Sequence, residues 1–348
     1  MAASPTRTAG SLPFEMGYRM PAEWQPHDST WLSWPKEPTT FPEDVIKRVE
    51  QTYIQIIEAL RQCERVDLLV DDQKVQSAVS RMLGSKEGVV FHKIRTADVW
   101  MRDYGPIFVK NAHVAAVKWK FNAYGNKYEE LKHDDEVGRQ VAAYTGLQTF
   151  EPGIILEGGS IDVNGLGSCI TTEQCLLNAN RNPQLQKKSI EGFLKNYLGI
   201  THVIWLGNGI AGDDTDGHVD DLARFVNPNT VVCMVENDKH DGNYKALKSN
   251  FERLNESVDQ SGAKLTVLPI RMPGSVSLDD TRLPASYANF YIANSAVLVP
   301  IFNDPNDRPA LETLRSVFPQ KKVIGIDCRA LVQGFGTIHC VTQQQPSP

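Results

Sequence analysis

Two short stretches of the sequence carry residues that could perform nucleophilic chemistry. One is GTIHCVTQ, which places Cys340 near the end of the chain and shortly after Gly334 and Gly336. The other is GDDTDGHVDDLARFV, which contains His218 and Asp220. A cysteine thiolate is a strong nucleophile, and a histidine can act beside it as general acid and base. Because glycine permits close backbone approach, we expect the two glycines to leave room for a substrate beside the sulfur.

The apolar residues in both stretches predict β-strands. In a strand, the spacing of two residues decides whether their side chains lie on the same face. Residues two positions apart share one face of a strand, so His218 and Asp220 should project together. Neighbouring residues point to opposite faces, so we expect His218, and not His339, to act on Cys340. The plainer alternatives are a solvated acidic turn capped by His218 and a cysteine that is buried as a small hydrophobic residue.

Acidic residues also stand just before two other strand-like runs. The stretch VWMRDYGPIFV contains Trp100 and Asp103, and ILEGGSIDV contains Glu157. If successive units close on one another, these side chains should converge with the cysteine and the histidine on one axis. An indole near two carboxylates suits a flat, delocalised cation, by stacking or by a cation–π contact. We interpret the adjacent Arg102 as structural, paired with one of the acidic groups.

The elements that must position these residues recur along the chain as hairpin, helix and strand. Apolar and β-branched runs flank a turn containing asparagine, which predicts β-hairpins at residues 106–119, 160–172, 222–235 and 289–302. Amphipathic patterns predict helices at residues 128–146, 182–199, 243–262 and 308–319, and short strands at 202–207, 264–270 and 322–328. A fifth unit has a strand at 29–35, a helix at 41–63, a strand at 65–70, an extra helix at 75–82 and a strand at 89–94.

This repetition predicts an α/β fold of five similar units. None of the units can cover its own apolar face, so we expect them to close into a ring, a five-bladed α/β propeller whose inner strands line a central channel. The alternative is an α/β sandwich in which the hairpin spacing is a coincidence. We expect a disordered tail at residues 1–12 and a single domain over residues 13–348.

Composition narrows the classes of partner. The formal net charge is −6, and no block of lysine or arginine is longer than a pair, which disfavours nucleic acid and is compatible with a small cationic substrate. The six cysteines form no CxxC pair, which favours reduced thiols and a cytoplasmic setting. No apolar run reaches the roughly 18 residues of a membrane span, so we expect no membrane partner. We also expect no metal, because soft ligands near His218 are too few.

Five ordered motifs together resemble a known family. They are MPAEWQPHDSTWLSWP, TADVWMRDYGP, LEGGSIDVNG, DDTDGHVDDLARFV and GTIHCVTQQQP, and they extend from about Phe14 to Pro346. The chain resembles the agmatine deiminase and bacterial-type peptidylarginine deiminase family of the guanidino-group-modifying (pentein) superfamily. That resemblance implies the five-bladed α/β propeller fold and no cofactor. Two motifs depart from the family, which often has DETNGHVDN and a run of glycines before the cysteine.

The resemblance also implies a role for each candidate residue. By that resemblance, Cys340 matches the family's nucleophile and His218 its general acid and base. Asp103 and Asp220 match the two carboxylates that clamp the guanidinium. Glu157 matches a glutamate that assists the histidine, and Trp100 matches a tryptophan that lines the pocket.

The expected reaction is hydrolysis of agmatine to N-carbamoylputrescine and ammonia, through a thiouronium intermediate on the cysteine. Agmatine ends in an amine, which calls for acidic residues at the far end of its site. Candidates for that role are Asp214, which we expect to bind substrate, and its acidic neighbours Asp213, Asp216 and Asp221, together with Glu23. The alternatives are a peptidylarginine or free-arginine deiminase of the same fold, an amidinotransferase, and a non-catalytic binding module. The resemblance also suggests a homodimer.

Overall fold

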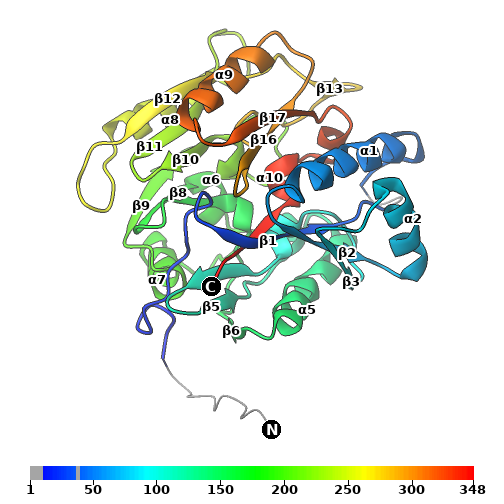
Figure 1. Cartoon of the computed structure of the whole chain (residues 1–348). Helices are drawn as coiled ribbons and strands as arrows, with labels where there is room; N and C mark the ends of the chain where they lie inside the picture. The colour runs from blue at the N-terminus through cyan, green and yellow to red at the C-terminus, as the bar shows by residue number, and fades with distance from the viewer. Residues whose placement is uncertain (1–10, 37–39) are drawn as a thin grey trace.

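The computed structural model describes residues 11–36 and 40–348. Most of the tail predicted at residues 1–12 therefore lies outside the described residues. The described chain has a mixed α/β fold with five sheets of three or four strands and a two-stranded ribbon formed by β13 (Ser277–Leu278) and β14 (Thr281–Arg282). In Figure 1 the helices α1, α2, α5, α7 and α9 lie toward the periphery, and the short helix α10 lies near the middle.

Four of the sheets follow the same plan, and they confirm the four predicted hairpins. In each, two antiparallel strands are followed by a helix and by a third strand parallel to the second. The first unit has β4 (Ile107–Lys110), β5 (Val114–Val117), α5 (Asp135–Thr145) and β6 (Gln148–Phe150). The second has β7 (Ile161–Val163), β8 (Ser168–Thr172), α7 (Lys187–Leu198) and β9 (His202–Leu206). The third unit has β10 (Ala223–Asn227), β11 (Thr230–Val235), α8 (Tyr244–Glu256) and β12 (Thr266–Arg271). The fourth has β15 (Tyr291–Ile292), β16 (Ala296–Ile301), α9 (Asp307–Val317) and β17 (Lys322–Asp327).

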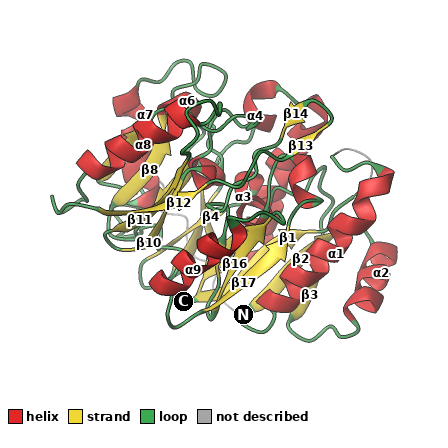
Figure 2. Ribbon diagram, turned by 90° about the horizontal axis from the view of Figure 1, so that it is seen from above, coloured by secondary structure: helices red, strands yellow, loops and turns green. Residues whose placement is uncertain are grey.

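The fifth sheet joins the two ends of the described chain. Its order is β18 (Gln343–Pro346), β1 (His27–Ser33), β2 (Arg65–Val70) and β3 (Val89–Lys93), with α1 (Glu43–Leu60) and α2 (Gln73–Leu83) as its connections. The strand β1 pairs with β18 antiparallel and with β2 parallel, so the last strand supplies the hairpin partner that the first unit lacks. Figure 2 shows α1 and α2 beside these strands, on the side of the molecule opposite α7 and α8.

Local sequence explains the helices of this unit. The buried side chains of α1 include Val45, Val49 and Ile56, which recur at helical spacing and face the sheet. Helix α2 begins at Asp72, whose carboxylate accepts hydrogen bonds from the backbone N–H groups of residues 74 and 75, at 2.7 and 2.9 Å. It ends at Gly84, which has a φ of 68° and so terminates the helix in the left-handed region.

Neighbouring sheets are held to one another by side chains. Gln343 at the start of β18 donates a hydrogen bond of 2.7 Å to the carbonyl of Pro106, just before β4. Arg224 of β10 forms an ion pair of 2.5 Å with Asp162 of β7. In the described part of the chain, backbone hydrogen bonds do not link the five sheets into one closed sheet.

Short helical turns precede the first strand of four units, and they correct the strand interpretation of the motifs. The turns α3 (Met101–Tyr104), η2 (Gly158–Ser160), η3 (Val219–Asp221) and α10 (Ile338–Val341) stand before β4, β7, β10 and β18. Cys340 and Asp220 therefore lie in helical turns and not in strands. The remaining short elements are α4 (Ala123–Asn126), η1 (Glu129–Asp134), α6 (Glu173–Leu176) and η4 (Leu331–Gly334).

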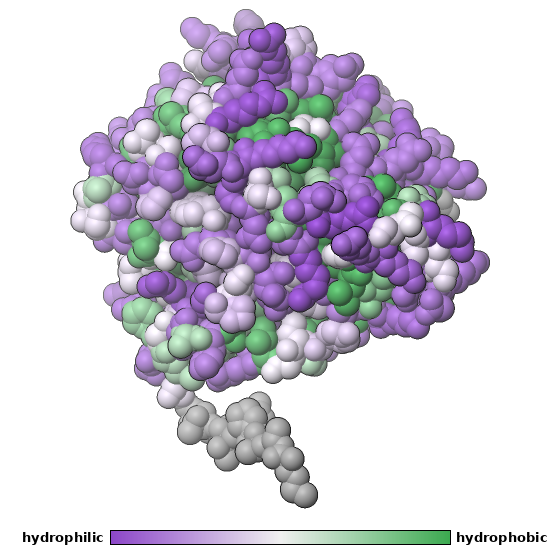
Figure 3. Space-filling view, in the orientation of Figure 1, coloured by the Kyte–Doolittle hydropathy of each residue, from purple (hydrophilic) through white to green (hydrophobic). Residues whose placement is uncertain are grey.

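The outer surface is polar over the face that Figure 3 shows, with hydrophobic residues in small, separate patches. Within residues 11–36 and 40–348, none of the helices has the length and apolar character needed to cross a membrane.

Candidate active site

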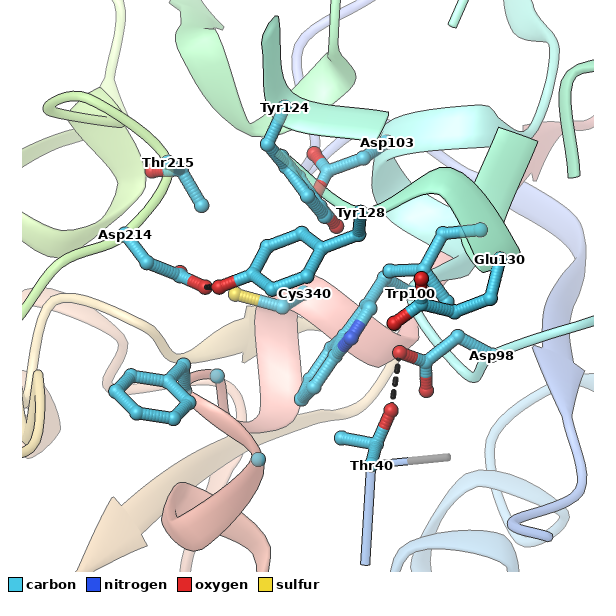
Figure 4. A pocket seen from close by; sticks show the side chains of 14 residues that line it. Thr40, Asp98, Trp100, Asp103, Tyr124, Tyr128, Glu130, Asp214, Thr215 and Cys340 are labelled. Carbon is cyan, nitrogen blue, oxygen red and sulfur yellow. Dashed lines mark hydrogen bonds between the residues drawn. The ribbon is translucent and has the colours of Figure 1, made fainter. Parts of the chain in front are cut away.

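A cavity of about 150 Å³ opens where the helical turns meet. Figure 4 shows Cys340, Asp103 and Trp100 at this cavity, with Tyr128 directed toward Asp214. The structure thus brings together at one cavity four of the residues predicted from the sequence. The other lining residues are Thr40, Asp98, Tyr124, Glu130, Leu131, Thr215, Gly334, Phe335 and Gly336.

Cys340 lies on the turn α10 and is buried, with its sulfur at the cavity wall. The amide of Asn289 donates a hydrogen bond of 3.1 Å to its Sγ, and Asp220 Oδ2 lies 3.8 Å from the same atom. Burial raises the pKa of the Cys340 thiol well above its usual range, and the negative charges of Asp220, Asp221 and Asp103 raise it further. In the free protein at neutral pH the group is therefore a protonated thiol.

Asn289 is a part of the site that sequence analysis missed. Its Oδ1 accepts hydrogen bonds from Thr337 Oγ1 at 2.7 Å and from the backbone N–H of His339 at 3.0 Å. The same side chain donates to the Cys340 sulfur. Asn289 therefore ties the start of the turn to the sulfur and fixes the direction of the thiol. Its stretch YANFYIAN predicts a strand, and no pattern in a single sequence marks this asparagine.

His218 is buried directly before η3, and its Nδ1 lies 3.7 Å from Asp103 Oδ1. Neither ring nitrogen has a hydrogen-bond partner among the described residues. Burial alone would lower the pKa of His218, but the nearby Asp103, Cys175 and Asp220 outweigh it and raise the pKa well above its ordinary value. The imidazole is therefore protonated at neutral pH and can serve as an acid.

The carboxylates of Asp103 and Asp220 face one point from two different turns. A Cβ placed on Gly159 would lie 2.6 Å from His218 Nδ1, 2.9 Å from Asp103 Oδ1 and 3.1 Å from Asp220 Oδ2. Only glycine fits there, because any side chain would collide with these groups. The backbone N–H of Gly159 also donates a 2.9 Å hydrogen bond to Asp103 Oδ1. Gly159 is thus a further site residue, and its only sequence signal is the Gly-Gly pair of the motif.

The two carboxyl groups have pKa values that are shifted in opposite directions. Burial raises the pKa of Asp103 to about 6, with His218 acting in the opposite direction. Burial would also raise the pKa of Asp220, but His339 and His218 lower it below its ordinary value. His339, the neighbour of Cys340 in the chain, hydrogen-bonds to the Asp220 carboxylate, with 2.7 Å between His339 Nδ1 and Asp220 Oδ2. The geometric reason given for setting His339 aside was wrong, because the residue is in a helical turn and not on the far face of a strand.

Glu157 is fully buried just before η2. Its Oε1 pairs with Arg181 Nε at 2.7 Å, and its Oε2 has no hydrogen-bond partner among the described residues. Its carboxylate, the sulfur of Cys175 and a ring nitrogen of His218 all lie within 4.8 Å of one another. The sequence analysis did not place Cys175 beside His218, so one more soft ligand lies there than expected, and the absence of a metal stays a prediction.

The glycines before Cys340 make room for aromatic rings. A Cβ on Gly336 would lie 2.5 Å from the Trp100 indole, and one on Gly334 would lie 2.6 Å from the ring of Phe41. Both glycines also line the cavity with Cys340, so the room that they leave for a substrate beside the sulfur stays a prediction. Phe335 stands between them with a φ of 69°, a conformation that favours glycine, and so keeps the backbone shape of a glycine run while adding a ring to the cavity wall.

The acidic cluster proposed for the far end of the substrate separates into residues with different surroundings. Only Asp214 lines the cavity, where Tyr128 donates a 2.5 Å hydrogen bond to it and burial raises its pKa to about 6. Asp216 pairs with Lys127 and Arg181. Glu23 is buried away from the cavity.

Ionic partners explain why Glu23 cannot meet the substrate. Its carboxylate pairs with Arg102 at 3.3 Å, Arg224 at 2.8 Å and His339 at 2.8 Å. The prediction that Arg102 pairs with an acidic group is confirmed by this contact. Of the remaining acidic residues, Asp213 accepts backbone N–H groups from the loop, and Asp221 is buried.

Two carboxyl groups that were not predicted also line the cavity. Asp98 accepts a hydrogen bond from Thr40, and burial raises its pKa to about 6. Glu130 lies on η1 at the cavity rim. With Asp103 and Asp214, the cavity therefore presents four carboxyl groups. No lysine or arginine is among its described lining residues.

The arrangement matches that of known proteins over nearly the whole chain. Residues 19–346 match the family model described as Porphyromonas-type peptidyl-arginine deiminase. The chain belongs to this family. A relative from Stutzerimonas stutzeri named agmatine deiminase is 36% identical over 366 residues, which cover 98% of this chain and 99% of that protein.

Two solved structures of family relatives match the fold described above. The agmatine deiminase of Enterococcus faecalis has a TM-score of 0.91 and 35% identity, over 98% of this chain and 99% of that one. The C. jejuni agmatine deiminase with substrate bound, a variant with serine in place of a cysteine, has a TM-score of 0.87 and 32% identity, over 95% and 96% of the two chains. The prediction of a mixed α/β fold of this family is confirmed.

The raised pKa of the Cys340 thiol predicts how fast it reacts in the free protein. Because the thiol is protonated at neutral pH, its rate of alkylation by iodoacetamide should rise about tenfold per pH unit from pH 7 to 9, without a plateau. Removing a nearby charge in Asp220→Asn should lower the pKa and increase the rate at pH 7. The labelled peptide is quantified by mass spectrometry, with Cys340→Ser as the control for assignment. A rate that stays constant from pH 6 to 9 would show a thiolate already formed.

Proposed function

We propose that this protein hydrolyses agmatine to N-carbamoylputrescine and ammonia through a covalent intermediate on Cys340. The observation that carries the proposal is a cavity that holds a cysteine and four carboxyl groups but, among its described lining residues, no lysine or arginine. Such a cavity suits a ligand that is cationic at both ends. Free arginine instead carries a carboxylate, which calls for a cationic partner. The names of the relatives favour the same substrate.

Substrate charge would activate the nucleophile. A guanidinium held between Asp103 and Asp220 cancels the negative field that raises the pKa of the Cys340 thiol, so the thiol can lose its proton to solvent as the substrate binds. Two carboxylates also orient the planar group by bidentate hydrogen bonds. Trp100 lines the same cavity and can stack on it.

The histidine would then move protons in two steps. The thiolate attacks the central guanidinium carbon, and protonated His218 gives its proton to a departing nitrogen, which leaves as ammonia. The neutral His218 next takes a proton from water, whose oxygen attacks the thiouronium carbon. Collapse of that adduct breaks the carbon–sulfur bond and releases the ureido product and the Cys340 thiolate. Glu157, within 4.8 Å of His218, stabilises the imidazolium form. No step requires a metal or an organic cofactor.

We also propose that the five sheets are the blades of an α/β propeller, in one domain over residues 13–348. The strand order shared by four sheets, the pairing of β18 with β1 and the meeting of the turns α3 and α10 at one cavity support this arrangement. The six free cysteines favour a cytoplasmic setting, and a homodimer is the assembly that we expect. The product, a ureido amine, places the reaction in putrescine and polyamine synthesis.

The substrate is tested by measuring ureido product and ammonia from agmatine, arginine and a blocked arginine peptide. We expect turnover of agmatine alone, and its loss in Cys340→Ser. Turnover of the peptide alone, or of arginine alone, would show that the protein is a deiminase that acts on that substrate and not on agmatine. Label transferred to an added amine acceptor would indicate an amidinotransferase. Absence of turnover with all three substrates would favour a binding module, and turnover that persists in Cys340→Ser would exclude this cysteine as the nucleophile.

Asp214 is proposed to bind the amine of agmatine, and its replacement gives a second prediction. At pH 8, above its pKa of about 6, Asp214→Asn removes a negative charge and should raise the KM for agmatine about tenfold or more, with little change in kcat.

A neutral-ended alkylguanidine serves as the control substrate, since its KM should not change in the variant. The exposed Asp238→Asn serves as the matched control for net charge. Equal KM increases for agmatine and the alkylguanidine would contradict the assignment, because the defect would then not concern the amine.

A further inference from the structure

Cys175 is a buried thiol beside the candidate catalytic groups, and the mechanism above does not use it. It lies on the short helix α6, next to Glu157 of the same unit and His218 of the following unit of the fold. One ligand atom from each of the three residues lies within 4.8 Å of the other two, and all three residues are buried. The set combines a thiol, an imidazole and a carboxylate, which are the ligand types that zinc prefers.

Unused lone pairs distinguish this cluster from ordinary packing. Buried polar atoms normally have hydrogen-bond partners, because a buried group without one costs free energy. Here Glu157 Oε2 and both ring nitrogens of His218 lack such a partner among the described residues. One ring nitrogen of His218 and one carboxylate oxygen of Glu157 therefore lie within 4.8 Å of the Cys175 sulfur and of each other.

The geometry points to an inhibitory metal site: we propose that Glu157, Cys175 and His218 bind one Zn²⁺ ion, with a fourth tetrahedral position left for water. The ion would occupy the lone pairs of His218 and Glu157, and so would stop deimination. The inhibitory part rests on the proposed function, whereas the binding part does not.

The surroundings hold all three ligands in place, as the partners of metal ligands usually do. Arg181 fixes the other oxygen of Glu157 at 2.7 Å. The backbone N–H of His218 donates to Asp213 at 3.1 Å, and that of Cys175 donates to Thr172 Oγ1 at 3.1 Å. Each ligand thus starts from a constrained backbone, and little ordering is needed for the ion to bind.

The cavity reaches residues that contact His218, while the three ligands themselves are buried behind its described lining residues. Asp103 and Thr215 line it, and both contact His218, Asp103 through its carboxylate at 3.7 Å and Thr215 through the backbone N–H of His218 at 3.3 Å. The positive charge of Arg181 and the protons that the thiol and the imidazole must release both oppose binding. We therefore expect Zn²⁺ to bind more weakly here than at structural zinc sites, so that added Zn²⁺ inhibits the reaction and a chelator restores it.

Binding is tested on full-length protein stripped with a chelator, by competition for Zn²⁺ with a chromophoric indicator. The unaltered protein and Cys340→Ser should bind one ion with dissociation constants that agree within about threefold. Cys175→Ala should bind at least about tenfold more weakly, because it lacks a ligand. With Co²⁺ in place of zinc, a thiolate-to-metal charge-transfer band should be present in the first two proteins and absent in Cys175→Ala.

The opposite pattern would overturn the proposal. Loss of binding and of the cobalt band in Cys340→Ser, with both retained in Cys175→Ala, would place the ion on the cavity cysteine. Failure of the unaltered protein to bind Zn²⁺ would exclude the site altogether. Circular dichroism and thermal unfolding verify that Cys175→Ala is folded, and Cys175→Ser replaces it if it is not.

Inhibition is then measured for each active protein relative to its own metal-free rate. We expect the Zn²⁺ concentration that halves the agmatine rate to be at least about tenfold higher in Cys175→Ala. An unchanged value would show that the inhibitory ion binds elsewhere. If the protein binds zinc as expected but deiminates none of the guanidino substrates, the proposed function fails and the metal site stands.

Discussion

Buried negative charge around one thiol is the constraint on which the site depends. Asp103, Glu157, Asp220 and Asp221 are all buried within a small volume, where each carboxylate loses the solvation of water. Arginines compensate for part of this charge, Arg181 at Glu157 and Arg224 in the network behind Asp220, and His339 hydrogen-bonds to Asp220. On the side of the cavity, burial raises the pKa of Asp103 and of the Cys340 thiol, and the nearby charge of Asp220 raises both further. A guanidinium supplies the missing charge, so binding and activation of the nucleophile are one electrostatic event.

The fold serves this arrangement by placing a helical turn before the first strand of four of its five units. A strand sends neighbouring side chains to opposite faces, whereas in a helical turn they point only part of a turn apart and can face the same buried region. Cys340 can therefore reach the cavity while His339, next to it, bonds to Asp220 and Glu23. The pairing of β18 with β1 anchors the last of these turns, because β18 begins two residues after α10 ends.

Sequence patterns predicted the parts of this structure that depend on local chemistry. Asparagine turns between β-branched runs marked the hairpins at residues 106–119 and 289–302, and amphipathic spacing marked α1 and α9. The turns Val219–Asp221 and Ile338–Val341 were misinterpreted as strands, since three or four residues are too few to distinguish a period of 2 from one of 3.6. The pairing of β1 with β18 joins opposite ends of the chain and leaves no local signal.

Residues that support the site from a distance were the hardest to predict. Asn289 and Cys175 have ordinary local sequences, and their importance arises only when distant units pack together. The five residues assigned from motifs, with Cys340 and His218 foremost, lie in one buried region as expected, while Glu23 was placed wrongly because its ionic partners come from three other segments. Long-range electrostatics is therefore the part that one sequence does not reveal.

The most direct test of the central claim is to trap the covalent intermediate. Protein mixed with agmatine is quenched with acid during turnover, digested and analysed by mass spectrometry. The account predicts an adduct of agmatine minus ammonia on the peptide that contains Cys340. Turnover without any adduct on that peptide, or with the adduct on another cysteine such as Cys175, would contradict it.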